Sequence, residues 1–387
     1  MNQSQLDKFI IYLQKNDWSV FGPVFATAKI EELSPFLAAH QPSSVKKSGQ
    51  TLIRKITKSA DLDLNGQPPF YSFKHFFVPE KELMFNYNRN KLAAPKIYPE
   101  HSQRNALIGM SILDLKAVNL YDQVFEKDPY YQNRRRNTLI IGYSLTPEIT
   151  DNIFEAKYEE DILEHLPFDI FLAEFNSPPP LLRRGGNNPL TSFSRNQQNA
   201  FTPLVKGGAG GLKIFTGSIK GQRILEHFGY KDYEHIQFSG PVKEGKLDEK
   251  MARLRDRLKN HHNPKIWEEL GKICIECGKC TLICPTCFCF RIDDNPSVEV
   301  GAGGRNRCWD SCYYQEFSEV AGPDKPGFGQ PKFLSTTAQR LHFWYFHKFA
   351  RIPDEFDFMG CVGCGRCTKV CPVGIDIAEV LGQIENT

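Results

Sequence analysis

The sequence predicts an α+β protein, with a mixed α/β sheet domain at the N-terminus and a mostly helical domain after it. Two observations lead to this prediction. Short apolar segments alternate with helix-like segments up to about residue 228, which is typical of a sheet covered by helices. All twelve cysteines lie between Cys274 and Cys371, so the last third of the chain is chemically distinct. We therefore expect a sheet domain at 1–240, a linker and helix over 241–263, and a cysteine-rich domain at 264–387.

Apolar periodicity and turn residues define the expected elements. A helix is predicted over 5–15, followed by a turn at Gly22-Pro23 and a strand from Val24 to Ile30. The sheet domain continues with strands predicted over 105–109, 137–142, 168–175 and 212–216, and with helices over 112–125 and 219–228. In the last third, helices are predicted over 247–259, 265–272 and 336–349.

Residues 176–211 differ in composition from the rest of the sheet domain. They include five Pro, six Gly and five Asn, but no Asp or Glu. Because a structureless loop of this length is uncommon inside a compact domain, the composition favours a low-complexity insertion that projects as a disordered loop. A basic binding loop is the functional alternative, but no aromatic or periodic pattern organises its four charges.

Eight of the cysteines form two identical runs. Each run reads C-x2-C-x2-C-x3-C-P, and the two runs begin at Cys274 and Cys361. This run is typical of [4Fe–4S] ligation: three thiolates lie on a tight turn, and the fourth begins the next helix and points to a neighbouring cluster. Gly278, Gly363 and Gly365 allow the backbone to close around such a group. Disulfides and zinc ribbons do not require this third thiol and trailing proline.

The sequence therefore predicts a ferredoxin-type domain with two [4Fe–4S] clusters and crossed ligation. The first cluster is assigned to Cys274, Cys277, Cys280 and Cys371, and the second to Cys361, Cys364, Cys367 and Cys284. In the alternative arrangement, each run closes its own cluster. The cations Lys272, Lys279, Arg366 and Lys369 flank the two runs. They would raise the reduction potential of an anionic cluster, dock an acidic partner, or serve as ordinary surface charges.

Six further residues have side chains that bind metals elsewhere. Cys287, Cys289, Cys308 and Cys312 supply four thiols, which is enough for a third metal site if the two pairs converge. Buried thiols that line the cysteine-rich domain are the structural alternative. His342 and His347 are five residues apart, so a helix would not place them on one face, and packing is the favoured interpretation.

Charge and chain start limit the possible partners. The 48 basic and 45 acidic side chains leave a net charge of +3, which gives no reason to expect nucleic acid. The apolar stretch at residues 9–13 is too short for a signal sequence or a membrane span, so no membrane insertion is expected. Cluster ligation requires reduced thiols, which favours the cytoplasm. Nucleotide-binding glycine loops and nucleophile elbows are absent, so no catalytic centre is visible.

The cysteine runs and the residues around them resemble a known family, the β subunit of cytoplasmic nickel–iron hydrogenases (sulfhydrogenases); the electron-transfer subunit of anaerobic sulfite reductase is similar. The resemblance is strong over roughly 265–380. It is carried by residues 280–289, 309–312, 347–349, 360–367 and 371–377, with fainter matches at 77–83, 128–131 and 137–138. It implies an iron–sulfur electron-transfer subunit working between a flavoprotein that carries FAD and uses NAD(P)H and a hydrogenase or reductase partner.

The N-terminal part departs from the family pattern. Relatives often carry G-V-R-P-C-D where this chain has Gly109-Met110-Ser111-Ile112-Leu113-Asp114, and no cysteine precedes Cys274. An N-terminal cluster of the family is therefore not expected in this chain. A redox-sensing or structural iron–sulfur protein is the hypothesis from another functional class.

Overall fold

The computed structural model describes most of the chain. The described residues are 1–26, 50–65, 68–88, 103–145, 160–174, 211–241, 243, 249–260, 264–297, 301–320 and 331–386. Nearly all of the predicted insertion at 176–211 lies outside these residues, as do residues 242, 244–248 and 261–263 of the predicted linker and helix at 241–263.

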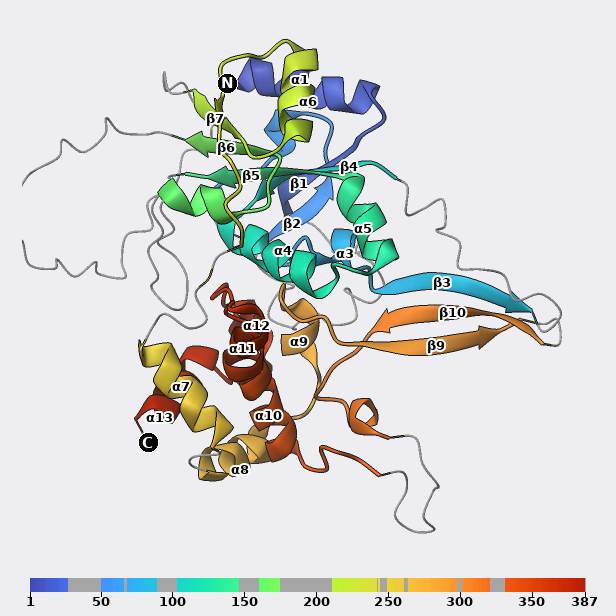
Figure 1. The fold of residues 1–387 in the computed structure, drawn as a ribbon, viewed down its shortest axis with the longest axis vertical. Helices are drawn as coiled ribbons and strands as arrows, with labels where there is room; N and C mark the ends of the chain where they lie inside the picture. The colour runs from blue at the N-terminus through green and yellow to red at the C-terminus, as the bar shows by residue number, and fades with distance from the viewer. Residues whose placement is uncertain are drawn as a thin grey trace, which may run out of the picture.

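A seven-stranded mixed sheet forms the centre of the N-terminal half (Figure 1), with the strand order β2-β1-β4-β5-β6-β7-β8. Strands β1, β4, β5 and β6 are parallel to one another, whereas β2 and β7 run antiparallel to β1 and β6. The strands are β1 Ser19–Ala26, β2 Gln50–Lys55, β4 Asn105–Met110, β5 Thr138–Ser144, β6 Ile170–Glu174, β7 Leu212–Thr216 and β8 Glu234–His235. β4 and β5 are almost wholly buried, as expected for parallel strands covered on both faces.

Helices cover the two faces of this sheet in separate groups (Figure 1). α1 (Gln3–Lys15) and α6 (Ile219–Phe228) cover one face. The opposite face carries α3 (Lys74–Phe77), α4 (Ile112–Val124) and α5 (Pro129–Arg136). The apolar stripe of α1 is fully buried and packs with residues of β1, β4, β5, β6 and β7 in one core. The helix begins at Asn2, whose side chain accepts from the Gln5 backbone N–H in a capping box.

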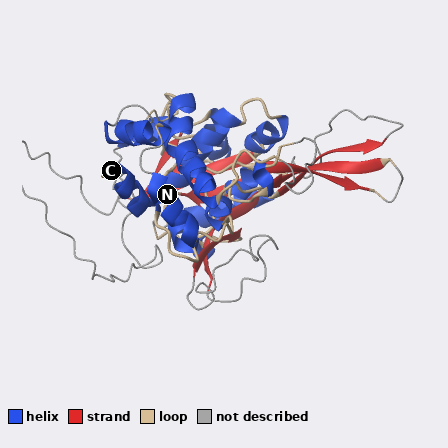
Figure 2. Ribbon diagram, turned by 90° about the horizontal axis from the view of Figure 1, so that it is seen from below, coloured by secondary structure: helices blue, strands red, loops and turns tan. Residues whose placement is uncertain are grey.

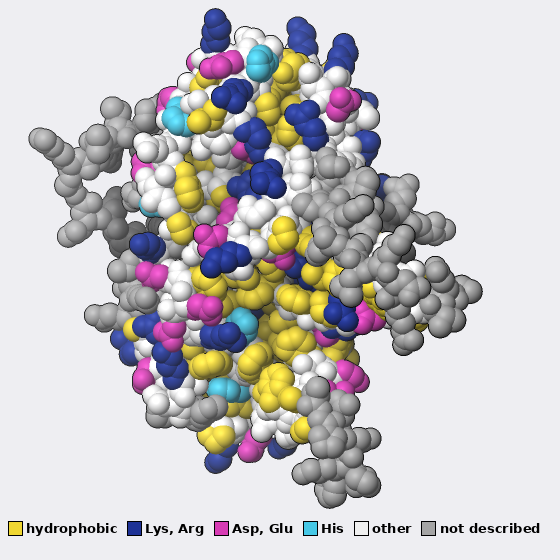
Figure 3. Space-filling view, turned by 45° about the vertical axis from the view of Figure 1, so that its right-hand side comes forward, with side chains coloured by type: hydrophobic (Ala, Val, Ile, Leu, Met, Phe, Trp, Pro, Cys, Tyr) yellow, Lys and Arg dark blue, Asp and Glu magenta, His cyan; other side chains and the backbone are white. Residues whose placement is uncertain are grey.

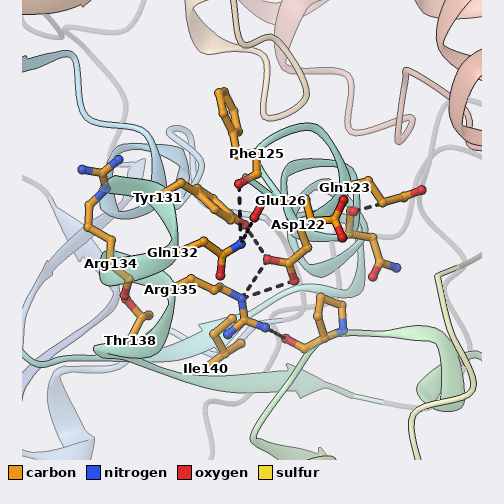
Figure 4. A network of polar contacts seen from close by, with 12 residues as sticks. Asp122, Gln123, Phe125, Glu126, Tyr131, Gln132, Arg134, Arg135, Thr138 and Ile140 are labelled. Carbon is orange, nitrogen blue, oxygen red and sulfur yellow. Dashed lines mark hydrogen bonds and ion pairs between the residues drawn. The ribbon is translucent and has the colours of Figure 1, made fainter. Parts of the chain in front are cut away.

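A polar network fixes α4 against α5 (Figure 4). Asp122 on α4 accepts a hydrogen bond from the Tyr131 hydroxyl at 2.6 Å and from Arg135 Nε at 3.1 Å, both on α5. Burial, together with the Asp122 carboxylate, raises the pKa of Tyr131 well above its usual value, which keeps the phenol a donor. The two helices are therefore held as one unit on the face that turns toward the cysteine runs.

A second sheet joins the two halves of the chain. β3 (Lys81–Asn88) pairs with β10 (Ala302–Trp309), which also pairs with β9 (Phe290–Pro296). This three-stranded ribbon projects from the body of the molecule (Figures 1 and 2). At its base, Trp309 Nε1 donates to the Val78 carbonyl at 3.0 Å. The expected domains at 1–240 and 264–387 thus share a sheet.

The last third holds the remaining helices below the sheet domain (Figure 1). They are α7 Glu249–Lys259, α8 Pro264–Ile273, α9 Lys279–Ile283, α10 Thr337–Phe346, α11 Ile352–Phe356, α12 Arg366–Val370 and α13 Ile377–Glu385. Between α10 and α11 lies a π-helical turn, His347–Arg351. Leu282, Val362 and Val370 from this region pack with residues of α4 and β4 in one continuous core.

The predicted fold class, α+β, is confirmed, and two local predictions need correction. Gly22-Pro23 is not a turn but lies inside β1, where Pro23 pairs with Ile53 of β2. Pairing between β1 and β4 ends at Phe21, so Pro23 has a neighbouring strand on one side only. The N–H that proline lacks is therefore not needed for a hydrogen bond to β4. The cysteine-rich domain also contains the β9–β10 hairpin, which the sequence did not reveal.

Candidate metal centre

The first cysteine run begins on a turn between α8 and α9 that has two left-handed residues. Cys280 lies within α9 and Cys284 follows its last residue, so the fourth cysteine does not begin a helix as predicted but ends one. Glu276 has a φ of 55° and Gly278 a φ of 69°. A Cβ built at Gly278 would lie 2.8 Å from the Tyr314 ring and 2.9 Å from Ser311 Oγ, so only glycine fits this turn. In the second run, Gly363 and Gly365 also have positive φ, at 75° and 67°. The backbone role predicted for these glycines is therefore present in both runs.

One cavity brings together thiols from both runs. It is lined by Cys274, Cys277 and Cys280 of the first run and by Cys371 and Cys367 of the second run. The other wall comes mainly from the aromatic face of α10, through Leu341, Trp344 and Tyr345. The four thiols assigned to the first cluster therefore border the same space.

Cys284, the fourth cysteine of the first run, lies close to the start of the second run, because Lys348 Nζ contacts both Cys284 Sγ and the carbonyl of Gly360, the residue before Cys361. Burial is the main reason that the pKa of Cys361, Cys364 and Cys367 is raised, and the charge of Cys284 raises each of them further. The pKa of Cys361 is raised to about 12. Such an effect acts over short distances in a buried environment. This second group is also the more enclosed, because two of its four thiols, Cys284 and Cys361, are buried, whereas all four thiols of the first group are half-buried.

Lys348 points into this second group from the π-helical turn. Its Nζ donates to Cys284 Sγ at 3.2 Å, to Thr286 Oγ1 at 3.0 Å and to the Gly360 carbonyl at 2.9 Å. The Thr286 hydroxyl itself donates to the Gly360 carbonyl at 2.8 Å. Lys348 and Thr286 thus tie the end of the first run to the residue that precedes Cys361 in the second.

The charge of Lys348 is compensated by sulfur. The side chain is buried, and within the described parts of the chain it has no carboxylate partner. Burial by itself lowers the pKa of Lys348, but Cys284, Cys287 and Cys361 raise it well above its usual value. An isolated buried ammonium is costly, so it needs a nearby anion. This donor set, four thiols with a buried cation beside them, fits an anionic iron–sulfur cluster.

Arg366 connects the second run to the sheet domain. Its guanidinium donates to both Asp114 carboxylate oxygens, at 2.8 and 3.1 Å, and to the Pro69 carbonyl at 3.0 Å. Burial acts to lower the pKa of Arg366, but Asp114 and Cys364 more than offset it and the pKa is raised. Of the four cations that flank the runs, Arg366 therefore forms a buried ion pair with Asp114. Lys272 and Lys369 are exposed.

Of the four remaining cysteines, Cys287, Cys289 and Cys312 lie near one another, whereas Cys308 lies apart. The Cys289 and Cys312 thiols share a hydrogen bond, and Cys287 shares one with Cys284. Cys308 lies on β10 with Asp293 as its hydrogen-bond partner. Among the residues that the structure describes, no group of three or more His, Cys, Asp or Glu is arranged to hold a single metal ion. The four thiols therefore do not meet at one point, because Cys308 lies apart from the other three.

Both histidines of α10 and its extension serve packing. His342 forms a hydrogen bond with the Leu258 carbonyl at 3.0 Å and meets Trp267 edge-on. His347 lies against Phe288 and Phe343, and burial lowers its pKa to about 4. Among the described residues, neither ring belongs to a group of three or more side chains that could hold a metal ion.

Sequence reasoning missed the residues that surround the thiols. Lys348 and Thr286 contact Cys284 directly, yet neither belongs to a ligand motif. A signal for Lys348 was available, because it is the only Lys, Arg, Asp or Glu in the aromatic stretch Leu341–Phe349. A charged residue in such a stretch is expected to have a buried partner.

Apolar surface lies next to the first group. Ile273 and Ile275 flank Cys274 and are 49% and 61% exposed, and Val373 follows Cys371 and is 37% exposed. Figure 3 shows that hydrophobic side chains gather on the lower half of the face it presents, whereas Lys and Arg are more frequent on the upper half. No helix among the described residues is long and apolar enough to span a bilayer.

Comparison with known proteins agrees with this geometry. A family model described as a 4Fe-4S dicluster domain matches residues 273–375, which contain both runs, so this region is similar to known iron–sulfur domains. Sulfhydrogenase 2 subunit beta of Pyrococcus furiosus is 27% identical over 316 residues, which cover 81% of this chain and 82% of that protein. The chain is thus related, over most of its length, to the iron–sulfur β subunits of sulfhydrogenases, and the predicted resemblance is confirmed. No solved structure matches the chain.

Proposed function

We propose that the chain is an electron-transfer subunit that holds two [4Fe–4S] clusters by crossed ligation. It would relay electrons between a flavoprotein that uses NAD(P)H and a catalytic partner of the nickel–iron hydrogenase type. The observation that carries the proposal is the doubled cysteine run; crossed ligation is supported by Cys371, which borders the same cavity as Cys274, Cys277 and Cys280, and by the electrostatic effect of Cys284 on the second run. A bound cluster of this kind supplies a one-electron redox centre. The name of the Pyrococcus furiosus relative supports a partner of this class.

The surroundings of the two thiol groups suit such a relay. Cys274, Cys277, Cys280 and Cys371 are half-buried and lie next to exposed apolar side chains, which commonly mark a contact with another protein. Cys284 and Cys361 are buried, and their chain neighbours Ile283 and Val362 belong to the core that also contains α4 and β4. The chain therefore offers one group close to the surface and one in its interior.

Iron content and selective substitution test the cluster assignment. The full chain, purified without oxygen, is expected to hold about eight irons. Under crossed ligation, C371S perturbs the electron paramagnetic resonance (EPR) signal that C277S also perturbs, and C284S perturbs the signal affected by C364S. About four irons in the wild-type chain would defeat the two-cluster assignment. Signals in which C371S groups with C364S would show that each run closes its own cluster.

Electron relay is tested in the assembled complex. The chain is expected to co-purify with a flavoprotein and a catalytic subunit, and NAD(P)H-dependent turnover of that subunit should fall more than tenfold in C277S or C364S. Turnover by the isolated catalytic subunit with an artificial electron donor serves as the control, because it bypasses this chain. Unchanged NAD(P)H-dependent turnover in both variants would favour a sensing or structural role.

A further inference from the structure

The two thiol groups lie in different electrostatic surroundings. Beside Cys284, Lys348 provides an ammonium that is only 2% exposed and donates directly to sulfur at 3.2 Å. Around the first group, the described cavity-lining residues include one cation, Lys279, which is half-buried and open to solvent. A buried charge acts through a low dielectric, whereas an exposed one is screened by water and salt. The positive potential at the second group is therefore the larger of the two.

The fold leaves Lys348 little freedom to move away. The π-helical turn adds a residue to the helix at this point, as is frequent at functional sites. The Gly360 N–H donates to the Lys348 carbonyl at 3.0 Å, while the Gly360 carbonyl accepts from Lys348 Nζ. A Cβ at Gly360 would lie 2.6 Å from the Lys348 carbonyl oxygen, so backbone packs directly on backbone. Lys348 is thus held both at its backbone carbonyl and at its Nζ, which keeps the ammonium beside Cys284.

We propose that Lys348 is a positioning residue that sets the order of the two reduction potentials. By donating to Cys284 and placing a buried positive charge beside it, Lys348 makes the cluster held by Cys361, Cys364, Cys367 and Cys284 the more easily reduced of the two. The inference rests on the proposed two-cluster function and deepens it. Hydrogen bonds to ligand sulfur and nearby cations both stabilise the added negative charge of the reduced state.

The expected consequence is that a single electron resides mainly on the second group. The chain would hold a single electron in its interior, beside α4 and the π-helical turn, and would release it through the half-buried first group near Ile275 and Val373. Thr286 contributes to the same arrangement, because its hydroxyl accepts from Lys348 and contacts Cys284 Sγ at 3.2 Å. Without Lys348, the preference for the interior group should weaken or reverse.

An EPR-monitored redox titration of the full chain tests this. K348M keeps the length of the side chain and removes its charge; the electron's preference for the second group should fall at least tenfold, which is ~59 mV for a one-electron couple. The reduction potential of the EPR signal that C284S perturbs should fall. The potential of the signal that C371S perturbs should change by less than the equivalent of a threefold change in the reduction equilibrium. K369M is the control. Lys369 lies between Cys367 and Cys371 in the sequence but is exposed, so water and salt screen its charge and the expected change is less than threefold.

Further variants keep the inference testable if K348M binds too little iron. K348R retains a cation, whereas K348Q retains only a hydrogen-bond donor. At equal iron content, the reduction potential of the second group should therefore be lower in K348Q than in K348R. T286V should lower the same potential by a smaller factor than K348M. If K348Q and K348R have equal potentials, or if K348M with about eight irons titrates as wild type, the inference is overturned. A wild-type chain without two reducible clusters would instead refute the proposed function on which it rests.

Discussion

Replacing Asp114 with Asn (D114N) tests whether the ion pair between Asp114 and Arg366 holds the two halves of the chain together. D114N preserves the shape of the side chain but removes the negative charge that faces the guanidinium. Both side chains are nearly inaccessible, with 2% and 3% exposure, and the pair has two N–O contacts at 2.8 and 3.1 Å. Arg366 would be left buried with carbonyl and amide partners only.

The expected cost follows from that burial. Removing one partner of a buried ion pair costs ~3–5 kcal/mol, because an uncompensated charge stays inside the protein. Domains above ~150 residues lose ~2–4 °C of Tm per kcal/mol, and at the lower end of that range D114N should lower Tm by about 6–10 °C. Arg366 also donates toward Cys364. We therefore expect faster iron release to a chelator in D114N as well.

Thermal unfolding of the anaerobic, iron-loaded chain would measure the effect, with D114N, R366Q and the double variant forming a cycle. The double variant should cost less than the sum of the single ones by about 2 kcal/mol, because the two residues interact directly. E234Q is the matched control: its pair with Lys213 has an N–O distance of 3.0 Å but is largely exposed, so the loss should be ~0–1 kcal/mol. The reasoning fails if D114N and E234Q lower Tm equally.

Two further predictions concern the surroundings of the thiols. G278A should reduce iron incorporation by about half, because its methyl group would meet the Tyr314 ring at 2.8 Å. Gly374 has a similar positive φ but open space around it, so G374A should bind iron fully, and equal iron content in the two variants would contradict this prediction. C308S should leave iron content and EPR spectra unchanged, because Cys308 lies on β10 beside Asp293; loss of iron would revive a third metal site.

Sequence patterns were sufficient for elements whose partners are local or whose periodicity is strong. α1 was predicted because Leu6, Phe9, Ile10 and Leu13 repeat at helical spacing, and all four are buried. β4 and β5 were predicted because they are continuous apolar runs. The β9–β10 hairpin was not predicted because its first strand, Phe290–Pro296, is polar and mostly exposed. The strand character of this segment comes from pairing with β10 and not from a buried face.

The same distinction applies to the metal centre. Ligand spacing is a local property, so the sequence predicts the thiols and the turn glycines. The cations are positioned by tertiary structure: Arg366 meets Asp114 across 252 residues, and Lys348 meets Cys284 across 64. From sequence alone, Arg366 was indistinguishable from Lys369, which is exposed. Only the fold separates a charge that acts on the thiols from one that faces water.

The pairing of β3 with β10 has a consequence for biosynthesis. β3 ends at Asn88 and β10 begins at Ala302, more than two hundred residues later. At ~5–20 residues per second, the ribosome needs roughly 10–40 s to deliver the partner strand. During that interval the nascent chain carries β3 with an open edge, and Glu82 lacks Arg307, whose Nε lies 3.0 Å from it in the folded protein. Release of Trp309 from the ribosome is therefore the point at which the first half of the chain can complete its own structure.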